Sequence, residues 1–345
     1  MIINQFFSSN TFLSITRHNL CLLGINNNRD NTLFIGVGET GSKITLDIVK
    51  EIKSADYLLL NFKKVFDQNK KNVTIDTGSW INPPIHKIRG SFLENIDKIS
   101  HIIDTFSNII IIGNLASKFG IAIIPTLTNI LHQIGDKVII SFVIMPFGFE
   151  KRRIFHSGVS LSFINKYSNS TIIVDNNSFL KNNPELSIPE CFKITNNAVK
   201  DIVITSCGKG FPNEFNVIAT SKESNNIEEV FSKSFTMCNN SKIKTIEQTC
   251  MFIYPAKEKI DRIDSIIQTA EKITDDLDNE INIISGPGNL SKIHLMIKTT
   301  NLLFSSYDPL NQFISINNFL DFEPETNNSI KEISHLKDIE TKVIQ

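Results

Sequence analysis

Six short, almost wholly apolar segments constrain the fold of this 345-residue chain more than any other feature. They are Leu33 to Gly36, Tyr57 to Leu60, Val73 to Asp76, Ile109 to Gly113, Val138 to Met145 and Thr171 to Val174. Helical periodicity separates them, most clearly over Leu93 to Phe106, Ile121 to Ile134 and Glu150 to Lys166. Strands that are apolar on both faces and alternate with helices are typical of a parallel sheet covered on both sides. The sequence therefore predicts an α/β fold whose strand-to-helix loops share one ligand-binding edge.

The remainder of the chain follows a different pattern. Two prolines, Pro184 and Pro189, precede a helix predicted over Glu190 to Thr205. Beyond it, strands are predicted at Phe215 to Ala219, Thr245 to Tyr254, Asn282 to Ser285 and Lys292 to Thr299, and helices at Ile227 to Phe235 and Lys259 to Leu277. We therefore predict an N-terminal extension (1–31), a parallel-sheet domain (32–187), a central helix (188–207), a smaller α+β domain (208–301) and a tail (302–345). Apolar residues at helical spacing in the tail predict a helix that docks on a protein partner or packs on its own domain: Ile330, Ile333, Leu336, Ile339 and Val343.

Composition excludes several classes of function. The chain has 35 basic and 36 acidic residues and a net charge of -1, so no nucleic-acid or anionic-membrane partner is expected. Its five cysteines form no C-x-x-C pair, which argues against a zinc site and a disulfide framework and favours a reducing cytoplasm. No apolar run approaches the roughly 20 residues of a membrane span, and neither a signal peptide nor a metal site is expected.

A glycine-rich segment follows the first predicted strand. In Gly36-x-Gly38-x-x-Gly41, the glycines allow close approach, and the helix predicted from Ile44 points its free N–H groups at the turn, as in phosphate sites. The same spacing fits a dinucleotide site, but such a site needs a carboxylate about 20 residues later, where this chain has Asn61. The glycines could also serve only tight packing of the strand and helix.

Two later segments resemble FtsZ, the prokaryotic relative of tubulin. Met145-Pro-Phe-Gly-Phe-Glu-Lys-Arg-Arg153 resembles the family's K-P-F-x-F-E-G-R-x-R, and Thr171 to Leu180 resembles I-V-I-P-N-D-R-L-L. The order of strands and helices matches the family from about Thr32 to Asn301. The resemblance implies a Rossmann-like tubulin/FtsZ-type domain that binds GTP or GDP, with Mg²⁺ accompanying GTP. It further implies head-to-tail self-assembly, or assembly with FtsZ-like proteins, in a cytoskeletal or division-related role.

The resemblance also implies a set of nucleotide ligands. They are Gly36, Gly38, Gly41 and Ser42 in the first phosphate loop, Asn61 near the nucleotide, Gly120 in the second phosphate loop, Glu150 and Arg153 at the ribose, Asn176 in the family's N-D loop, and Asn197 at the base. The loop Gly78 to Pro83 stands where the family holds the terminal phosphate.

Two departures from the family pattern bear on function. The phosphate loop G-G-G-T-G-T-G becomes Ala116 to Ala122, where Lys118 could compensate for lost glycines and Phe119, like Trp80, could fill the nucleotide's space. In the first loop, Glu39 would oppose a triphosphate if it faces the pocket.

The family's water-orienting N-x-D-x-x-D loop has no counterpart, since Cys207 to Glu214 contains no aspartate. Weak or absent GTP hydrolysis is therefore expected. The alternatives are a structural or regulatory paralogue that binds no nucleotide, and an active GTPase that uses an unrecognised residue.

Overall fold

A computed structural model describes residues 31–52, 54–62, 72–78, 82–207, 216–241, 243, 246–256, 267–268, 280–284 and 289–299, and the backbone alone at 13–16 and 278–279. The chain divides into two units, Met1–Asp308 and Pro309–Gln345, and all described residues belong to the first. The predicted tail helix, most of the helix predicted at Lys259 to Leu277, and Trp80 lie outside the described residues. The proposed domain boundaries stay a prediction.

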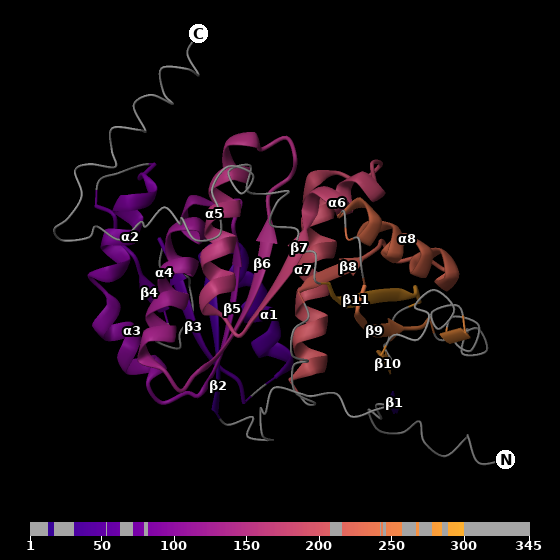
Figure 1. Ribbon diagram of the computed structural model, residues 1–345, viewed down its shortest axis with the longest axis horizontal. Helices are drawn as coiled ribbons and strands as arrows, with labels where there is room; N and C mark the ends of the chain where they lie inside the picture. The colour runs from indigo at the N-terminus through magenta and orange to yellow at the C-terminus, as the bar shows by residue number, and fades with distance from the viewer. Residues whose placement is uncertain are drawn as a thin grey trace, which may run out of the picture. The chain divides into compact units, whose positions relative to one another are not determined.

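Seven parallel strands form the first part of a single sheet (Figure 1). In spatial order they are β4 (Asn72–Thr74), β3 (Asp56–Asn61), β2 (Thr32–Val37), β5 (Asn108–Asn114), β6 (Val138–Met145), β7 (Ser170–Asp175) and β8 (Val217–Thr220). All but the short edge strand β4 are almost wholly buried. The predicted parallel α/β sheet is therefore confirmed. Its strand order reverses direction between β2 and β5, the kind of switch point at which ligands of such sheets bind.

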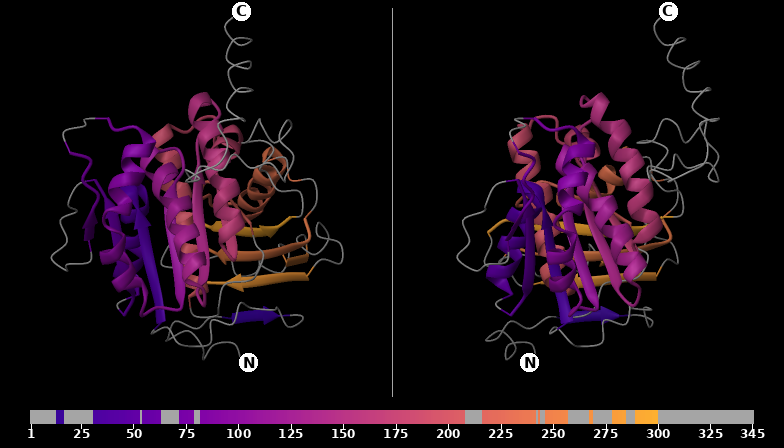
Figure 2. Two further views of the ribbon diagram at one scale, coloured as in Figure 1. Left: turned by 60° about the vertical axis from the view of Figure 1, so that its left-hand side comes forward. Right: turned by 90° about the vertical axis from the view of Figure 1, so that its left-hand side faces the viewer.

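The same sheet continues into the second half of the chain. Strand β11 (Lys292–Lys298) pairs antiparallel with both β8 and β9 (Gln248–Tyr254), β10 (Asp278–Ile283) pairs parallel with β9, and β1 (Leu13–Thr16) closes the edge against β10. Only two residue pairs, Ile173 with Val217 and Val174 with Ile218, join β7 to β8. Figure 2 (left) shows the orange and yellow strands of this half running across the direction of the earlier ones.

Helices cover both faces of the sheet. One face carries α1 (Gly38–Glu51) and α7 (Ile188–Ser206), whose apolar residues pack on strands of both halves. The other face carries the remaining described helices: α2 (Ile85–Leu93), α3 (Ile96–Ile103), α4 (Lys118–Ile134), α5 (Lys151–Tyr167), α6 (Asn176–Asn182) and α8 (Ile227–Asn240). Successive strand residues alternate between the two cores: Leu33 and Ile35 face one, and Phe34 faces the other.

Several helix boundaries differ from the predictions. Helix α1 begins at Gly38 instead of Ile44, because a single left-handed residue, Gly38 (φ 72°), makes the whole turn. The helix predicted over Leu93 to Phe106 corresponds to α3, and α2, which starts directly after Pro84 and ends at Leu93, was not predicted. Helix α6 was not predicted. Asp175 caps it by accepting hydrogen bonds from the N–H groups of Asn177 and Ser178. None of the helices in the described part of the chain has the length and hydropathy of a membrane span.

Candidate functional site

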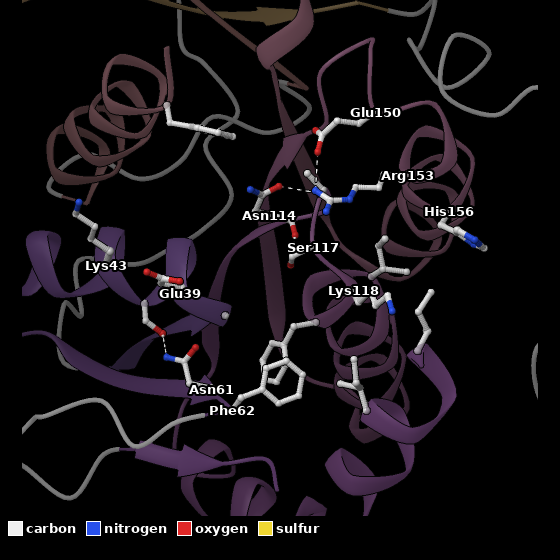
Figure 3. A pocket seen from close by; sticks show the side chains of 18 of the residues that line it. Glu39, Lys43, Asn61, Phe62, Asn114, Ser117, Lys118, Glu150, Arg153 and His156 are labelled. Carbon is white, nitrogen blue, oxygen red and sulfur yellow. Dashed lines mark hydrogen bonds and ion pairs between the residues drawn. The ribbon is translucent and has the colours of Figure 1, made fainter. Parts of the chain in front are cut away.

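An open cleft of about 1430 Å³ lies at the carboxyl edge of the parallel strands (Figure 3). The segments that follow β2, β3, β5 and β6 line it, and the first turns of α7 form part of its wall. Of the residues implied by the resemblance, five line the cleft, namely Gly38, Ser42, Asn61, Glu150 and Arg153. The other five, Gly36, Gly41, Gly120, Asn176 and Asn197, do not. Asn82 and Pro83 of the predicted terminal-phosphate loop also line it.

The glycines outside the lining are explained by packing within the protein. A Cβ on Gly41 would lie 2.1 Å from the carbonyl oxygen of Ile112, and one on Gly120 would lie 2.1 Å from that of Asn114. Gly36 is similarly enclosed by the start of α1. These glycines are therefore required by the fold whether or not a ligand binds, whereas Gly38 lines the cleft itself.

One wall of the cleft is the start of α1. Its N-cap, Val37, offers no side-chain acceptor to the first N–H groups. Ser42 and Asn61 meet at the floor, where the Asn61 amide donates to Ser42 Oγ at 2.6 Å. Glu39 and Lys43 project from α1 on one side of the cleft in Figure 3. The polar groups expected near a phosphate are thus present, but two of them already bind each other.

The loop after β5 satisfies its own backbone. Asn114 Oδ1 accepts the N–H of Ala116 at 2.7 Å, and Ser117 Oγ accepts the N–H of Gly120 at 3.0 Å, as the N-cap of α4. Phe119 is 4% exposed, and its ring meets that of Phe62 at 4.4 Å between centroids. The N–H groups of Ala116 and Gly120 are therefore not free for a ligand. Asn114 was missed in the sequence, although a polar residue ending an apolar strand marks such an edge.

A carboxylate and a guanidinium pair at the opposite wall. Glu150 Oε1 accepts from Arg153 Nη1 at 2.5 Å, and Glu150 Oε2 accepts the N–H of Phe147 at 3.1 Å. The Glu150 side chain is 17% exposed and that of Arg153 57%. Both line the cleft together with Arg152 and His156. The pair predicted at the ribose is therefore assembled, with the carboxylate held in place by the start of α5.

Aromatic rings gather where the β6–α5 loop meets α7, and two asparagines of α6 and α7 have buried amide atoms without partners among the described residues. The rings of Phe147 and Phe149 stack at 5.3 Å, and Phe192 of α7 packs edge-on against Phe147 at 5.1 Å. Asn176 is fully buried, and neither of its amide atoms has a hydrogen-bond partner among the described residues. Asn196 Oδ1 is likewise buried without a partner in the described part of the chain.

The face of α7 distinguishes two neighbouring asparagines. Asn196 comes four residues after Phe192 and so shares its face, whereas Asn197 is exposed and points about 100° away from Asn196. Sequence analysis chose Asn197. Neither asparagine is among the residues that line the cleft, and the assignment of Asn197 stays a prediction.

The two halves of this cleft differ in the residues that line them. The half beside α5 and the start of α7 is lined by the rings of Phe147, Phe149 and Phe192 and by the Glu150 carboxylate, whereas Asn176 and Asn196 are not among the lining residues. In the half between α1 and α4, Phe119 is buried and the N–H groups of Ala116 and Gly120 are bonded within the loop, while Lys43 and Lys118 also line the cleft. Among the described residues, no group of three or more His, Cys, Asp or Glu side chains could hold a metal ion.

The fold is that of the doubly wound α/β proteins, which bind ligands at the carboxyl edge of the sheet. Three features show it: the sheet order, the helices on both faces and the cleft at the switch point. No protein-family model matches the sequence, and no curated protein matches it. Solved structures do match, and they show an FtsZ/tubulin-like fold, as the segments around Glu150 and Asn176 predict.

Three of these structures span most of the chain. FtsZ of M. jannaschii, an empty dimer, has a TM-score of 0.63 at 15% identity, covering 79% of this chain and 88% of FtsZ. CetZ of Methanosaeta thermophila has a TM-score of 0.62 at 14% identity, with 91% and 95% covered. CetZ2 of Haloferax volcanii, a GTPγS-bound protofilament, has a TM-score of 0.57 at 14% identity, with 80% and 96% covered.

Proposed function

We propose that this chain is a self-assembling, cytoskeletal FtsZ/tubulin-like protein that recognises a guanine nucleotide in the cleft and hydrolyses GTP weakly or not at all. The observation that carries the nucleotide part is a set of three buried amide atoms, Asn176 Nδ2, Asn176 Oδ1 and Asn196 Oδ1, that lack partners in the described part of the chain. A buried polar group without a hydrogen bond costs about 1–3 kcal/mol. These atoms lie outside the cleft lining, and a base edge that reached them would remove that cost.

Recognition of guanine follows from the chemistry of these groups. The Asn196 Oδ1 accepts hydrogen bonds, which suits the N1–H and amino donors of guanine, while the Asn176 amide can both donate and accept. Phe192 offers a ring for the base to pack on. Glu150, held by Arg153, would accept from a ribose hydroxyl. The GTPγS-bound CetZ2 protofilament supports the same assignment for a protein of this fold.

Self-assembly is supported by exposed apolar side chains at the cleft. Three of the large apolar residues that are exposed in the described part of the chain line it: Phe149 at 60%, Ile188 at 41% and Phe62 at 39%. Exposed apolar groups concentrated at one edge mark an interaction surface. A second copy of the chain, stacked head to tail, would cover them.

Weak or absent hydrolysis rests on the connection between α7 and β8. Helix α7 ends at Ser206 and β8 begins at Val217. The intervening residues include Glu214 but no aspartate. An orienting base for the attacking water typically contributes about 100-fold to 10,000-fold to a rate. Without the family's two aspartates that contribution is lost.

Calorimetric titration of the full-length protein with GMP and GDP tests the nucleotide part. We expect saturable binding that weakens at least about tenfold in Asn196→Ala, because one charge-neutral hydrogen bond to a buried group is lost. The adjacent, exposed Asn197→Ala is the matched control and should bind as the parent does. Equal losses in both variants would contradict the assignment.

The second candidate is a structural protein that binds no nucleotide. The self-bonded loop after β5 and the buried Phe119 ring favour it. Absence of binding by any guanine ligand at millimolar concentration, with assembly intact, would decide for this candidate.

A further inference from the structure

We propose that two lysine side chains, Lys43 and Lys118, hold the di- or triphosphate of the nucleotide, in place of a cradle of backbone amides. This inference rests on the proposed function and deepens it. It concerns the half of the cleft between α1 and α4, where Figure 3 shows Lys43 on one side and Lys118 on the other.

The first observation is the balance of charge in the cleft. Its described lining contains five lysine and arginine side chains and three carboxylates. Two of the carboxylates form ion pairs with cations of the same lining, at 2.7 and 2.5 Å. The charged side chains outside these pairs are Lys43, Lys118, Arg152 and Glu39, so positive charge is in excess. Because the whole chain has a net charge of -1, this excess is local and attracts an anion to the cleft.

The second observation is that Lys118 is positioned and still has donors to offer. Its Nζ donates to Asn82 Oδ1 at 2.9 Å, and both residues line the cleft. In the described part of the chain this is the only partner of the ammonium group, which has three N–H donors. Asn82 is neutral, so it orients the ammonium group at the wall of the cleft without cancelling its charge.

The third observation is that two helices begin at the cleft with cations. Lys118 is the first residue of α4 and Arg152 the second residue of α5, and neither first turn contains a carboxylate. The Glu150 carboxylate before α5 is already paired with Arg153. The partial positive charge of a helix N-terminus disfavours cations. An anion bound between the two helices would offset this repulsion.

Backbone amides contribute less in this half of the cleft. The N–H of Ala116 is bonded by Asn114 Oδ1 at 2.7 Å, and that of Gly120 by Ser117 Oγ at 3.0 Å. The loop after β5 therefore offers an anion the Lys118 side chain that follows it, and few amides.

The placement of the two lysines sets the class of anion. Because they lie on opposite sides of the cleft, a single phosphate group cannot satisfy both, whereas a chain of two or three phosphates carries charge toward each. Glu39, in the first turn of α1, opposes part of this attraction.

The test compares guanosine, GDP and GTP, with Mg²⁺, by titration calorimetry on the full-length protein. We expect GTP to bind at least about tenfold tighter than guanosine. Lys118→Ala should weaken GTP at least about tenfold and leave guanosine within about twofold, because one charge-assisted hydrogen bond to phosphate is lost. Lys43→Ala should change the ratio of the two affinities in the same direction. Lys118→Arg keeps the charge and should bind GTP within about threefold of the parent, and Glu39→Gln should tighten GTP.

The matched control is Lys98→Ala, which changes the net charge equally at an exposed position of α3 outside the cleft lining and should leave all three affinities unchanged. Parent protein that binds GTP no tighter than guanosine overturns the inference and leaves the proposed function standing. Unchanged GTP affinity in both folded lysine-to-alanine variants of the cleft, or an equal loss in the control, also overturns it. Folded parent protein that binds none of the three ligands overturns the nucleotide part of the proposed function and this inference with it.

Discussion

At the scale of single residues, backbone proximity decides which glycines the protein needs. Gly41 lies against β5, where a Cβ would be 2.1 Å from Ile112 O, a distance that no real contact shows. Gly90, in the interior of α2, is exposed and has no atom within 4 Å of a Cβ position. The two glycines look alike in the sequence and differ entirely in their surroundings.

We expect Gly41→Ala to lower the free energy of unfolding by about 2 kcal/mol or more, since α1 must move away from β5. Gly90→Ala should raise the free energy by about 0.5–1 kcal/mol, because alanine is the better helix former. Urea denaturation measures both. A neutral Gly41→Ala would show that α1 does not pack against β5 as closely as described.

The sequence predicted some of these residues and not others for physical reasons. Gly38, Ser42, Asn61, Glu150 and Arg153 follow buried strands, and strand ends of a parallel sheet converge on one edge. Whether a glycine serves a ligand or a neighbouring backbone depends on atoms far away in the chain. Sequence spacing does not contain that information.

At the scale of elements, α7 is tied to the second half of the sheet by a buried charged cluster. Asp201 of α7 pairs with Lys292 of β11 and accepts a hydrogen bond from His294 Nε2 at 3.3 Å. Thr220 Oγ1 lies 2.9 Å from His294 Nδ1, and the Lys292 ammonium lies over the Tyr254 ring at 4.4 Å. A neutral His294 that donates through Nε2 and accepts through Nδ1 satisfies both neighbours.

This cluster makes stability depend on pH. Burial lowers the pKa of His294 more than Asp201 raises it, so the imidazole is neutral in the folded protein. The unfolded chain then binds the extra proton first, and stability falls as pH drops below about 6.5, by up to about 1.4 kcal/mol per pH unit. Burial would raise the pKa of Asp201, but His294 and Lys292 together hold it well below its usual range, which adds a loss of the same sign in stronger acid.

We expect His294→Gln to flatten the dependence of the unfolding free energy on pH between 5 and 7. The measurement is urea denaturation at several pH values. His101→Gln, at an exposed position of α3, is the matched control and should retain the slope of the parent. An unchanged slope in the His294 variant would show that another group carries the effect.

The type of an element could be predicted from the sequence where its periodic pattern covers many residues. It could be predicted less well where only a capping residue marks the element. The buried strands and helices α4, α5 and α7 were found, since each has many residues in one pattern. Helix α6 was missed because seven residues carry little periodicity, and only the Asp175 cap marks its start. The α7–β11 cluster was also missed. Two polar residues on one face of β11, Lys292 and His294, were its only local sign.

At the scale of the whole molecule, the apolar residues at the mouth of the cleft predict concentration-dependent assembly. Phe149→Asp places a charge at the most exposed of them and should abolish pelleting or raise the critical concentration at least about tenfold. Leu93→Asp, an equally apolar exposed position at the far end of α2, should assemble like the parent. Assembly measured by light scattering that is insensitive to Phe149→Asp would place the contact elsewhere.

The pairing of β7 with β8 has a mechanical consequence. Main-chain hydrogen bonds, including Ile173 N–H to Asn216 O at 2.9 Å, run without interruption from one half of the sheet to the other. Helix α7 is packed across the same seam. Flexing one half against the other would break that ladder and shear the helix from its contacts. We therefore expect the two halves of the sheet to move as one body.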